Sequence, residues 1–394
     1  MTVDEQLKVL GRGCVELVSE EELKKKLSSG KKLRVKLGVD PTSPDLHLGH
    51  SVPLQKVRAF QDLGHQAVLI IGDFTTRVGD PSGRDSTRPV LTKEDIEANA
   101  KTYTDQAFKV LDREKTEVVY NSEWLEPFME KKLLTTLRSH TVQQILARED
   151  FQNRMGANSP ITMLELLYPL LQGYDSVAVK ADVELGGNDQ LFNLLMGRKM
   201  QKDDGQDSQI AMTLPLLVGL DGEKKMSKSY DNYIGLTDSP REMFGKLMRI
   251  SDDAMWTYYE LLTTEDIDAV KALHPMEAKK SLGEKLVTRF HSSDAASAER
   301  KFFDDTFSKR EAPKDVPEVR VSQEQLDIPW FQFLVEIEAA KSKKEARRLL
   351  QQGAVKLGDS KVAETAKVSI LKDAGEQPVS LKVGKHRFYN LTVA

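Results

Sequence analysis

The feature that most constrains the fold of this chain is a strand–helix–strand pattern near its N-terminus. Residues 33–39 alternate apolar and polar side chains, and 67–71 form a continuous apolar run; both patterns are typical of strands, the second buried on both faces. Between them, apolar residues recur at helical spacing over 52–63, where Pro53 is acceptable only in the first helical turn. This βαβ unit predicts an α/β fold with a Rossmann-like, doubly wound parallel sheet.

Ligands of such sheets bind beyond the carboxyl ends of the strands. The segments that follow the two strands are 40–50 and 73–88. We therefore expect both segments at the mouth of one binding site.

Local signals divide the rest of the chain. Helix start signals succeed one another after residue 236, and prolines among charges over 307–330 indicate a linker. We expect a doubly wound domain over 1–235, a helical domain over 236–306 and a small α+β domain over 331–394. Residues 1–30 have no clear pattern of their own.

Charge is uneven along the chain, although the formal net charge is only −4. Residues 330–394 contain twelve Lys and Arg against seven Asp and Glu, a local excess of five positive charges. An acidic body with a basic terminal domain is a pattern to explain, because clustered positive charge suits a polyanionic partner.

Other features bound the protein class. The single cysteine, Cys14, allows neither an internal disulfide nor a cysteine-based zinc site. The sequence has no run of 18 apolar residues, and its first residues lack the features of a signal or transit peptide. We expect a cytoplasmic protein with no membrane partner. The absence of a complete P-loop or dinucleotide fingerprint argues against those two nucleotide-binding classes.

Two histidines begin the helix after the first strand. His47 and His50 follow a Pro-rich turn, where free N–H groups and the helix dipole favour phosphate. The imidazoles can add hydrogen bonds to phosphate or ribose oxygens, and Gly49 leaves room for a flat base. A capped helix with two surface histidines is the plainer interpretation.

Two polar loops could bind anions. In the first, over 79–88, Asp80 can accept hydrogen bonds from an ammonium group while Arg84 and Arg88 reach phosphates. In the second, Lys225 and Lys228 flank hydroxyl groups and suit a polyphosphate whose charge shifts during a reaction. Each loop taken alone could equally be an ordinary solvated loop.

A polar stripe interrupts an otherwise apolar helix. Tyr168, Gln172 and Asp175 fall on one face if the helix persists to Asp175, and a second polar cluster follows over 186–190. Polar side chains on a core-facing stripe indicate a pocket. The alternative, a solvated face, is weakened by the surrounding leucines.

Taken together, these motifs resemble a known family. His47-Leu-Gly-His50, followed about 180 residues later by Lys225-Met-Ser-Lys-Ser229 on a βαβ framework, resembles the class I aminoacyl-tRNA synthetases. The chain resembles the bacterial-type tyrosyl-tRNA synthetase family more specifically, in four further stretches: 40–47, 79–83, 172–175 and 186–190. The terminal stretch 340–356 is similar to an S4 RNA-binding domain.

The resemblance implies an activity and its partners. Such an enzyme joins L-tyrosine to ATP, forming tyrosyl-adenylate and pyrophosphate, and then transfers the tyrosyl group to the 3′-terminal ribose of tRNA(Tyr). ATP would enter as its Mg²⁺ complex, with no protein-bound metal. The helical domain would approach the anticodon region, and a homodimer is expected.

The resemblance also implies roles for single residues. The amino group and backbone of tyrosine would be held by Asp80, Tyr168, Gln172 and Gln190, the phenol by Asp175, in a pocket ordered by Asn121 and Trp124. ATP would be met by Asp40, Thr42, His47, Gly49, His50, Gly187, Asp189 and Ser227. The leaving pyrophosphate would be clamped by Arg84, Arg88, Lys225 and Lys228, and phosphates of tRNA by Lys343, Lys344, Arg347 and Arg348.

One position departs from the best-known members, which place a tyrosine in the strand before the Asp-Pro-Thr turn. This chain has Lys36 there and resembles the subgroup that carries lysine. We expect Lys36 among the tyrosine-binding residues, paired with Asp175 and keeping that carboxylate ionised. Strand alternation also permits Lys36 to face solvent.

Two rival functions remain open. A related enzyme could activate tryptophan, although the stretch 172–175 favours a ligand with a hydroxyl group. A noncatalytic RNA-binding relative is the other rival, but it would not need the cations assigned to pyrophosphate.

Overall fold

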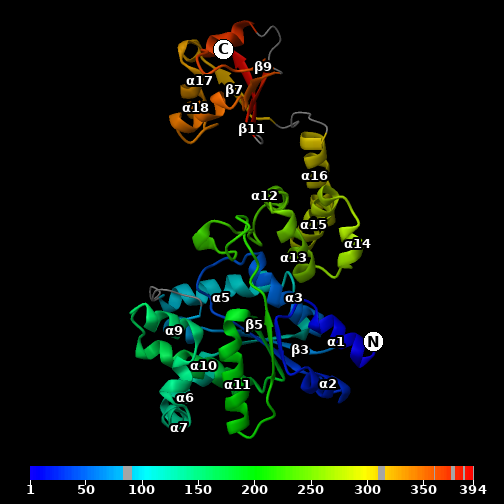
Figure 1. The fold of residues 1–394 in the computed structure, drawn as a ribbon, viewed down its shortest axis with the longest axis vertical. Helices are drawn as coiled ribbons and strands as arrows, with labels where there is room; N and C mark the ends of the chain where they lie inside the picture. The colour runs from blue at the N-terminus through cyan, green and yellow to red at the C-terminus, as the bar shows by residue number, and fades with distance from the viewer. Residues whose placement is uncertain (83–90, 309–315, 359, 374–377, 385–386, 394) are drawn as a thin grey trace. The chain divides into compact units, whose positions relative to one another are not determined.

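The computed structural model describes residues 1–82, 91–308, 316–358, 360–373, 378–384 and 387–393. It comprises two compact units, Met1–Ser297 and Ala298–Ala394 (Figure 1). Each unit has its own sheet.

The described part of the first unit contains a six-stranded sheet in the order β1-β6-β5-β2-β3-β4. Its strands are β1 (Glu16–Val18), β2 (Arg34–Val39), β3 (Gln66–Ile71), β4 (Thr116–Tyr120), β5 (Val183–Gly187) and β6 (Ile210–Leu214). The predicted doubly wound parallel sheet is confirmed for β2 to β6. It is not wholly parallel, because β1 adds an antiparallel edge strand against β6.

The strand order creates a switch point at β2. The chain runs outward from β2 to β3 and β4, and then returns to lay β5 on the other side of β2. A crevice opens beyond the carboxyl ends of strands at such a reversal. We therefore expect the binding site at the carboxyl ends of β2 and β5.

Helices surround this sheet (Figure 1). Those of the first part are α1 (Val3–Gly11), α2 (Glu20–Ser28), α3 (Leu48–Asp62), α4 (Thr75–Val78), α5 (Lys93–Ala107), α6 (Ser122–Lys131), α7 (Leu133–Arg138), α8 (Val142–Leu146), α9 (Glu149–Gly156), α10 (Met163–Val179) and α11 (Leu191–Asp203). Val68 and Ile70 of β3 pack against Val179 at the end of α10. That face of the sheet is consequently buried under α10.

Two local expectations are revised. Pro53 was predicted to lie in the first turn of the helix, but it lies in the second turn of α3. Because proline has no N–H, it cannot donate to the Gly49 carbonyl. Residues 1–30, which had no interpretation, fold as α1, β1 and α2, with Leu10 and Leu23 fully buried. The N-terminal segment is therefore part of the first unit's core.

Helices follow one another after residue 236, as expected. They are α12 (Pro240–Leu247), α13 (Asp252–Leu262), α14 (Ile267–Lys271), α15 (Pro275–Phe290) and α16 (Ser293–Phe303). Ser239, Ser251 and Asp266 cap α12, α13 and α14, and each of them belongs to a start signal in the sequence. The start of α15 at His274 was not anticipated.

The second unit is an α+β structure. Its described strands form a five-stranded sheet in the order β7-β11-β10-β8-β9. The elements are β7 (Glu318–Val321), α17 (Trp330–Glu336), α18 (Lys343–Gln351), β8 (Val355–Leu357), β9 (Ser360–Lys361), β10 (Val379–Val383) and β11 (Arg387–Val393). Residues 307–330 are thus not a linker throughout, because β7 pairs in parallel with β11.

Candidate active site

The two separated signature motifs lie side by side. Backbone hydrogen bonds join residues 46–48 to 234–236: the Leu48 N–H donates to the Ile234 carbonyl and the Leu236 N–H to the Leu46 carbonyl, each at 2.9 Å. Lys228 Nζ lies 3.4 Å from both Ser43 Oγ and Asp45 Oδ2. Residues 225–229, which we call the lysine loop, therefore border the turn that leads to the two histidines.

Both histidines are neutral donors. His47 caps α3, and its Nδ1 accepts the Gly49 N–H at 3.2 Å, while His50 Nδ1 accepts the His47 N–H at 3.2 Å. With both Nδ1 atoms occupied as acceptors, each neutral ring carries its proton on Nε2. Burial, the His50 ring and the Lys228 ammonium lower the pKa of His47 to about 2; burial and Lys228 lower the pKa of His50 to about 4.

Gly49 has a structural reason of its own. A Cβ at this position would lie 2.9 Å from Cε1 and 3.0 Å from Nδ1 of the His47 ring. Any side chain here would push the ring off the backbone N–H that orients it. Glycine is thus required at position 49 because the His47 ring occupies the space that a side chain would need.

The lysine loop is held at its base by a residue that the sequence did not single out. Asn232 is 3% exposed; its side-chain oxygen accepts the Ser227 N–H at 2.8 Å, and its Nδ2 donates to the Lys225 carbonyl at 3.1 Å. Met226, which lies between the two lysines in the sequence, is buried. The loop backbone is consequently fixed while the lysine side chains remain partly exposed.

A cavity of about 330 Å³ opens at the predicted edge of the sheet. The predicted site residues that line it are Asp40, Thr42, His50, Asp80, Asn121, Tyr168, Gln172, Asp175, Gly187, Asp189 and Gln190. Residues assigned to a nucleotide and residues assigned to an amino acid thus share one cavity.

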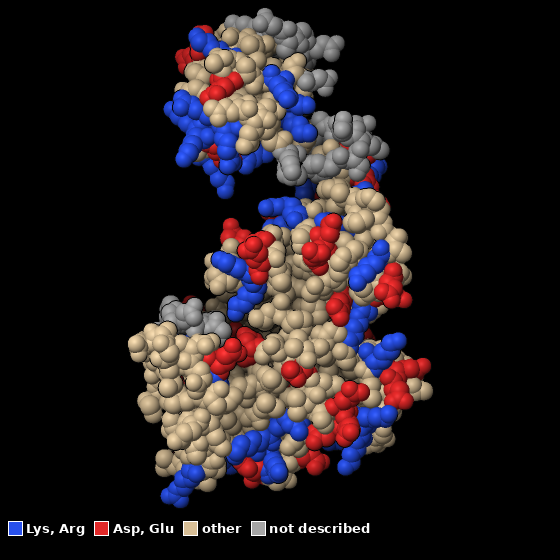
Figure 2. All heavy atoms as spheres, in the orientation of Figure 1, with Lys and Arg blue, Asp and Glu red and all other residues tan. Residues whose placement is uncertain are grey.

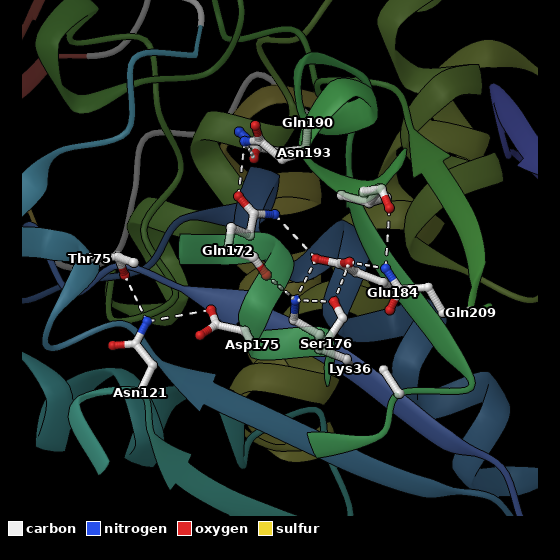
Figure 3. A network of polar contacts seen from close by, with 12 residues as sticks. Lys36, Thr75, Asn121, Gln172, Asp175, Ser176, Glu184, Gln190, Asn193 and Gln209 are labelled. Carbon is white, nitrogen blue, oxygen red and sulfur yellow. Dashed lines mark hydrogen bonds and ion pairs between the residues drawn. The ribbon is translucent and has the colours of Figure 1, made fainter. Parts of the chain in front are cut away.

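A chain of hydrogen bonds orders one wall of this cavity. The Tyr168 hydroxyl donates to Asp40 Oδ2 at 2.9 Å, and Thr75 Oγ1 donates to Asp40 Oδ1 at 2.7 Å. Asn121 Nδ2 donates to Thr75 Oγ1 at 3.0 Å and to Asp175 Oδ2 at 3.4 Å (Figure 3). Burial and the Asp40 carboxylate raise the pKa of Tyr168, so its hydroxyl stays a donor.

Asp175 is a buried carboxylate, 4% exposed. Its Oδ1 accepts the indole N–H of Trp124 at 2.8 Å. Burial raises its pKa to about 7, against the Lys36 ammonium and the bonds from Trp124 and Asn121, which lower it. A carboxylate kept in a pocket at this cost suits a ligand that donates a hydrogen bond.

Asp189 lines the same cavity as Asp175. Desolvation and the Asp80 carboxylate raise its pKa, and the Lys225 ammonium opposes that shift. Lys225 is therefore within electrostatic reach of the cavity mouth.

Two family models match this chain. "tRNA synthetases class I (W and Y)" covers residues 28–308, and "Tyrosine--tRNA ligase SYY-like C-terminal domain" covers 309–391. The tyrosine–tRNA ligase of Aquifex aeolicus is 51% identical over 99% of both chains. The chain belongs to the tyrosine–tRNA ligase family. The ligase of Thermotoga maritima is 48% identical, over 100% of this chain and 98% of its own.

Solved structures of the family share the fold. A C-terminally truncated mitochondrial tyrosyl-tRNA synthetase from Aspergillus nidulans superposes with a TM-score of 0.64 at 23% identity, covering 77% of this chain and 94% of its own. The tyrosyl-tRNA synthetase of Archaeoglobus fulgidus, complexed with L-tyrosine, gives 0.62 at 23% identity, over 76% and 100%.

Lys36 does not pair with Asp175 in this ligase, and it does not face solvent. It is register-aligned with Val68 and Glu184 on the face that α10 buries, and it is 0% exposed. Its Nζ lies 2.8 Å from Glu184 Oε1 and donates to Ser176 Oγ at 2.8 Å and to the Gln172 carbonyl at 3.1 Å (Figure 3). Three partners occupy the three N–H donors, so Lys36 supports the pocket from behind.

Glu184 and Asn193 are buried polar residues that sequence reasoning missed. Glu184 accepts Gln172 Nε2 at 3.2 Å, and Asn193 Nδ2 donates to the side-chain oxygens of Gln172 and Gln190, each at 2.9 Å. The signal for Glu184 was a lone charge inside a short apolar strand. Asn193, three residues after Gln190, had no such signal.

The remaining predicted residues lie elsewhere. Arg84 and Arg88 fall outside the described residues. On α18 of the second unit, Lys343, Lys344, Arg347 and Arg348 are all exposed and line one shallow depression, while Ala346 and Leu350 face the core.

Proposed function

We propose that this tyrosine–tRNA ligase uses the single cavity at the β2–β5 switch point for both substrates of amino-acid activation. The observation that carries the proposal is the shared cavity: His50 and Asp175 line the same space, and Lys228 borders the turn before His47. Tyrosine and ATP would be held with their reacting groups adjacent, which is the main requirement when two substrates react with each other.

In this proposal the tyrosine side chain points to Asp175, whose carboxylate accepts the phenolic O–H. The α-ammonium group is held by Asp80, with Tyr168, Gln172 and Gln190 around it. Asn121 and Trp124 act by orienting Asp175. Lys36 has no direct contact with the substrate, because its donors are already used.

ATP would lie along the start of α3. The neutral Nε2–H groups of His47 and His50 donate to the nucleotide, with Asp40, Thr42, Gly49 and Gly187 around it and Asp189 accepting from the ribose. Lys225 and Lys228, with Ser227 and the arginines at 84 and 88, would stabilise the leaving pyrophosphate. ATP enters as its Mg²⁺ complex, so the metal arrives as part of the substrate.

The chemistry then follows from positioning and charge. The tyrosine carboxylate attacks the α-phosphorus, the bond to the β-phosphate bridging oxygen breaks, and pyrophosphate leaves. A terminal ribose hydroxyl of tRNA, the 2′-OH by the class I resemblance, next attacks the acyl carbonyl and releases AMP. The protein supplies fixed donors and cations where negative charge develops.

A tyrosine-dependent ATP–pyrophosphate exchange assay tests this function. We expect exchange with L-tyrosine and none with L-tryptophan, because the donor of tyrosine is at the far tip of the ring, where it can reach Asp175, whereas the indole N–H of tryptophan projects from the side of a larger ring. Exchange with tryptophan alone would indicate the related activity, and no exchange with either would indicate a noncatalytic RNA-binding protein.

The second unit would bind tRNA(Tyr) through α18, as its S4-like stretch implies. The four exposed cations lie on the outward face of α18, and Arg347 stacks on Phe331 with its guanidinium carbon 4.2 Å from the ring centre. Figure 2 shows Lys and Arg gathered on this unit around α17 and α18. Such a surface suits phosphates and gives affinity more than sequence reading.

Removing two of these cations should weaken tRNA binding and leave tyrosine activation intact. For Lys344→Ala/Arg348→Ala we expect the slope of log Kd against log salt to fall by about one to two, the value for two lost phosphate contacts. Filter binding at several salt concentrations measures it. Lys24→Ala on α2 is the matched control, and an unchanged slope in the double variant would contradict the assignment.

We also propose that the ligase is a homodimer. Large apolar side chains are unusually exposed between α7 and α10, including Leu134 at 80% and Met163 at 77%. Figure 2 shows few charged side chains over α6, α9 and α10, and apolar surface of this kind marks association sites. Sedimentation at micromolar concentration should give twice the mass of the chain, and Leu134→Glu/Met163→Glu should give single chains.

We place the ligase in the cytoplasm, where its tRNA and ATP are found. In the described part of the chain, the helices are all too short or too polar to cross a membrane.

A further inference from the structure

The buried polar network behind Asp80 is held by two residues to which no role has yet been given, Arg148 and Asn193. Arg148 precedes α9 and is 3% exposed; Asn193 is on α11 and is 0% exposed. Arg148 NH1 donates to Asn193 Oδ1 at 2.9 Å. Its charge is neutralised by Asp150, which accepts from Nε at 2.9 Å and from NH2 at 3.1 Å.

The charged ends of this network permit only one orientation of its amides. A guanidinium has donors alone, so the Asn193 oxygen must face Arg148 and its NH₂ must face Gln172 and Gln190. The far ends are carboxylates, which only accept: Gln172 Nε2 donates to Glu184, and Gln190 Nε2 donates to Asp80 Oδ2 at 2.8 Å. Figure 3 shows the run from Gln190 through Asn193 to Gln172 and Glu184.

Arg148 also reaches Asp80 by a second route. Its NH2 donates to Ser82 Oγ at 2.8 Å, and the Ser82 N–H donates to Asp80 Oδ1 at 2.9 Å. Both oxygens of Asp80 are therefore oriented from Arg148, one through Asn193 and Gln190 and the other through Ser82. The hydrogen bonds close into a ring.

We propose that Arg148 and Asn193 are positioning residues for the α-ammonium group of tyrosine. The inference rests on the proposed placement of that group beside Asp80. The network holds the Asp80 carboxylate in one orientation and keeps the side-chain oxygens of Gln172 and Gln190 as acceptors. If either amide turned over, its NH₂ group would take the place of the oxygen. An ammonium group only donates hydrogen bonds, so it could not bind to that NH₂ group.

The test compares two ligands that differ only in the ammonium group. These are L-tyrosine and 3-(4-hydroxyphenyl)propanoate, with Kd measured by calorimetry on the full-length protein. Asn193→Leu is uncharged, close in size and removes both donors. We expect it to weaken tyrosine binding by about tenfold or more, the range for lost hydrogen bonds to a charged group. Binding of the propanoate should change less than about twofold.

A second variant guards against misfolding at position 193. Arg148→Lys keeps the charge beside Asp150 but cannot serve Asn193 and Ser82 together, and the same tyrosine-selective loss is expected. Asn153→Leu, at an exposed position of α9, is the matched control. Equal weakening of both ligands, or no change in either, would overturn the inference. Failure of the unmodified protein to bind tyrosine would instead contradict the proposed function.

Discussion

Replacing Asp175 by asparagine should lower kcat/KM for tyrosine activation by about a hundredfold, which corresponds to a hydrogen bond of about 3 kcal/mol to a charged acceptor. The amide keeps one oxygen for the Trp124 indole N–H. Its NH₂ then occupies the Oδ2 position, where the Asn121 donor and the phenolic O–H would both need an acceptor. Phenylalanine makes no such bond, so its activation should hardly change, and the tyrosine preference should fall by the same factor.

The pH dependence of tyrosine binding gives an independent readout of the same carboxylate. Burial raises the pKa of Asp175 to about 7. A phenol donates to the ionised form, so the KM for tyrosine should rise as the pH falls through about 7, by at most about tenfold per unit. The profile should be flat in Asp175→Asn and unchanged in Asp62→Asn, an exposed carboxylate on α3. A flat profile in the unmodified enzyme would contradict the role of Asp175.

The parts of the site that could be predicted are those whose signal is local. His47 and His50 stand at a helix start recognisable from neighbouring residues, and Tyr168, Gln172 and Asp175 share one face of a single helix. Their placement at one end of the sheet follows from the βαβ pattern, because consecutive parallel strands end on the same side. For these residues, local pattern and tertiary position agree.

The parts that could not be predicted depend on which strands become neighbours. Lys36 meets Glu184 only because β5 returns to the free side of β2, and nothing near either residue specifies that register. Arg148 meets Asn193 across 45 residues, from the position before α9 to the middle of the separate helix α11. Strand alternation allowed Lys36 to face solvent, and coverage of that face by α10 removed the option.

Lys36→Met should destabilise the ligase by about 3–5 kcal/mol, the penalty for leaving one member of a buried ion pair uncompensated. The Lys36 and Glu184 side chains are 0% and 1% exposed, and water cannot replace the lost ammonium. Gly197 packs so closely that a Cβ there would lie 2.8 Å from Ser176 Oγ, which leaves the cluster little room to relax. Urea unfolding followed by circular dichroism measures the loss.

A second substitution separates charge balance from a direct substrate role. In Lys36→Met/Glu184→Gln the buried charge is removed. Gln209 can then turn its amide to accept from the new NH₂ through Oε1, which has no hydrogen-bond partner among the described residues. We expect most of the stability to return. Tyrosine binding should be retained at a pH well above 7, where Asp175 stays ionised without the Lys36 ammonium. Lys31→Met is the matched control: its ion pair with Asp182 is 67% exposed on the lysine side, and exposed pairs contribute at most about 1 kcal/mol. If the double variant recovers its stability but does not bind tyrosine, Lys36 acts directly on the substrate.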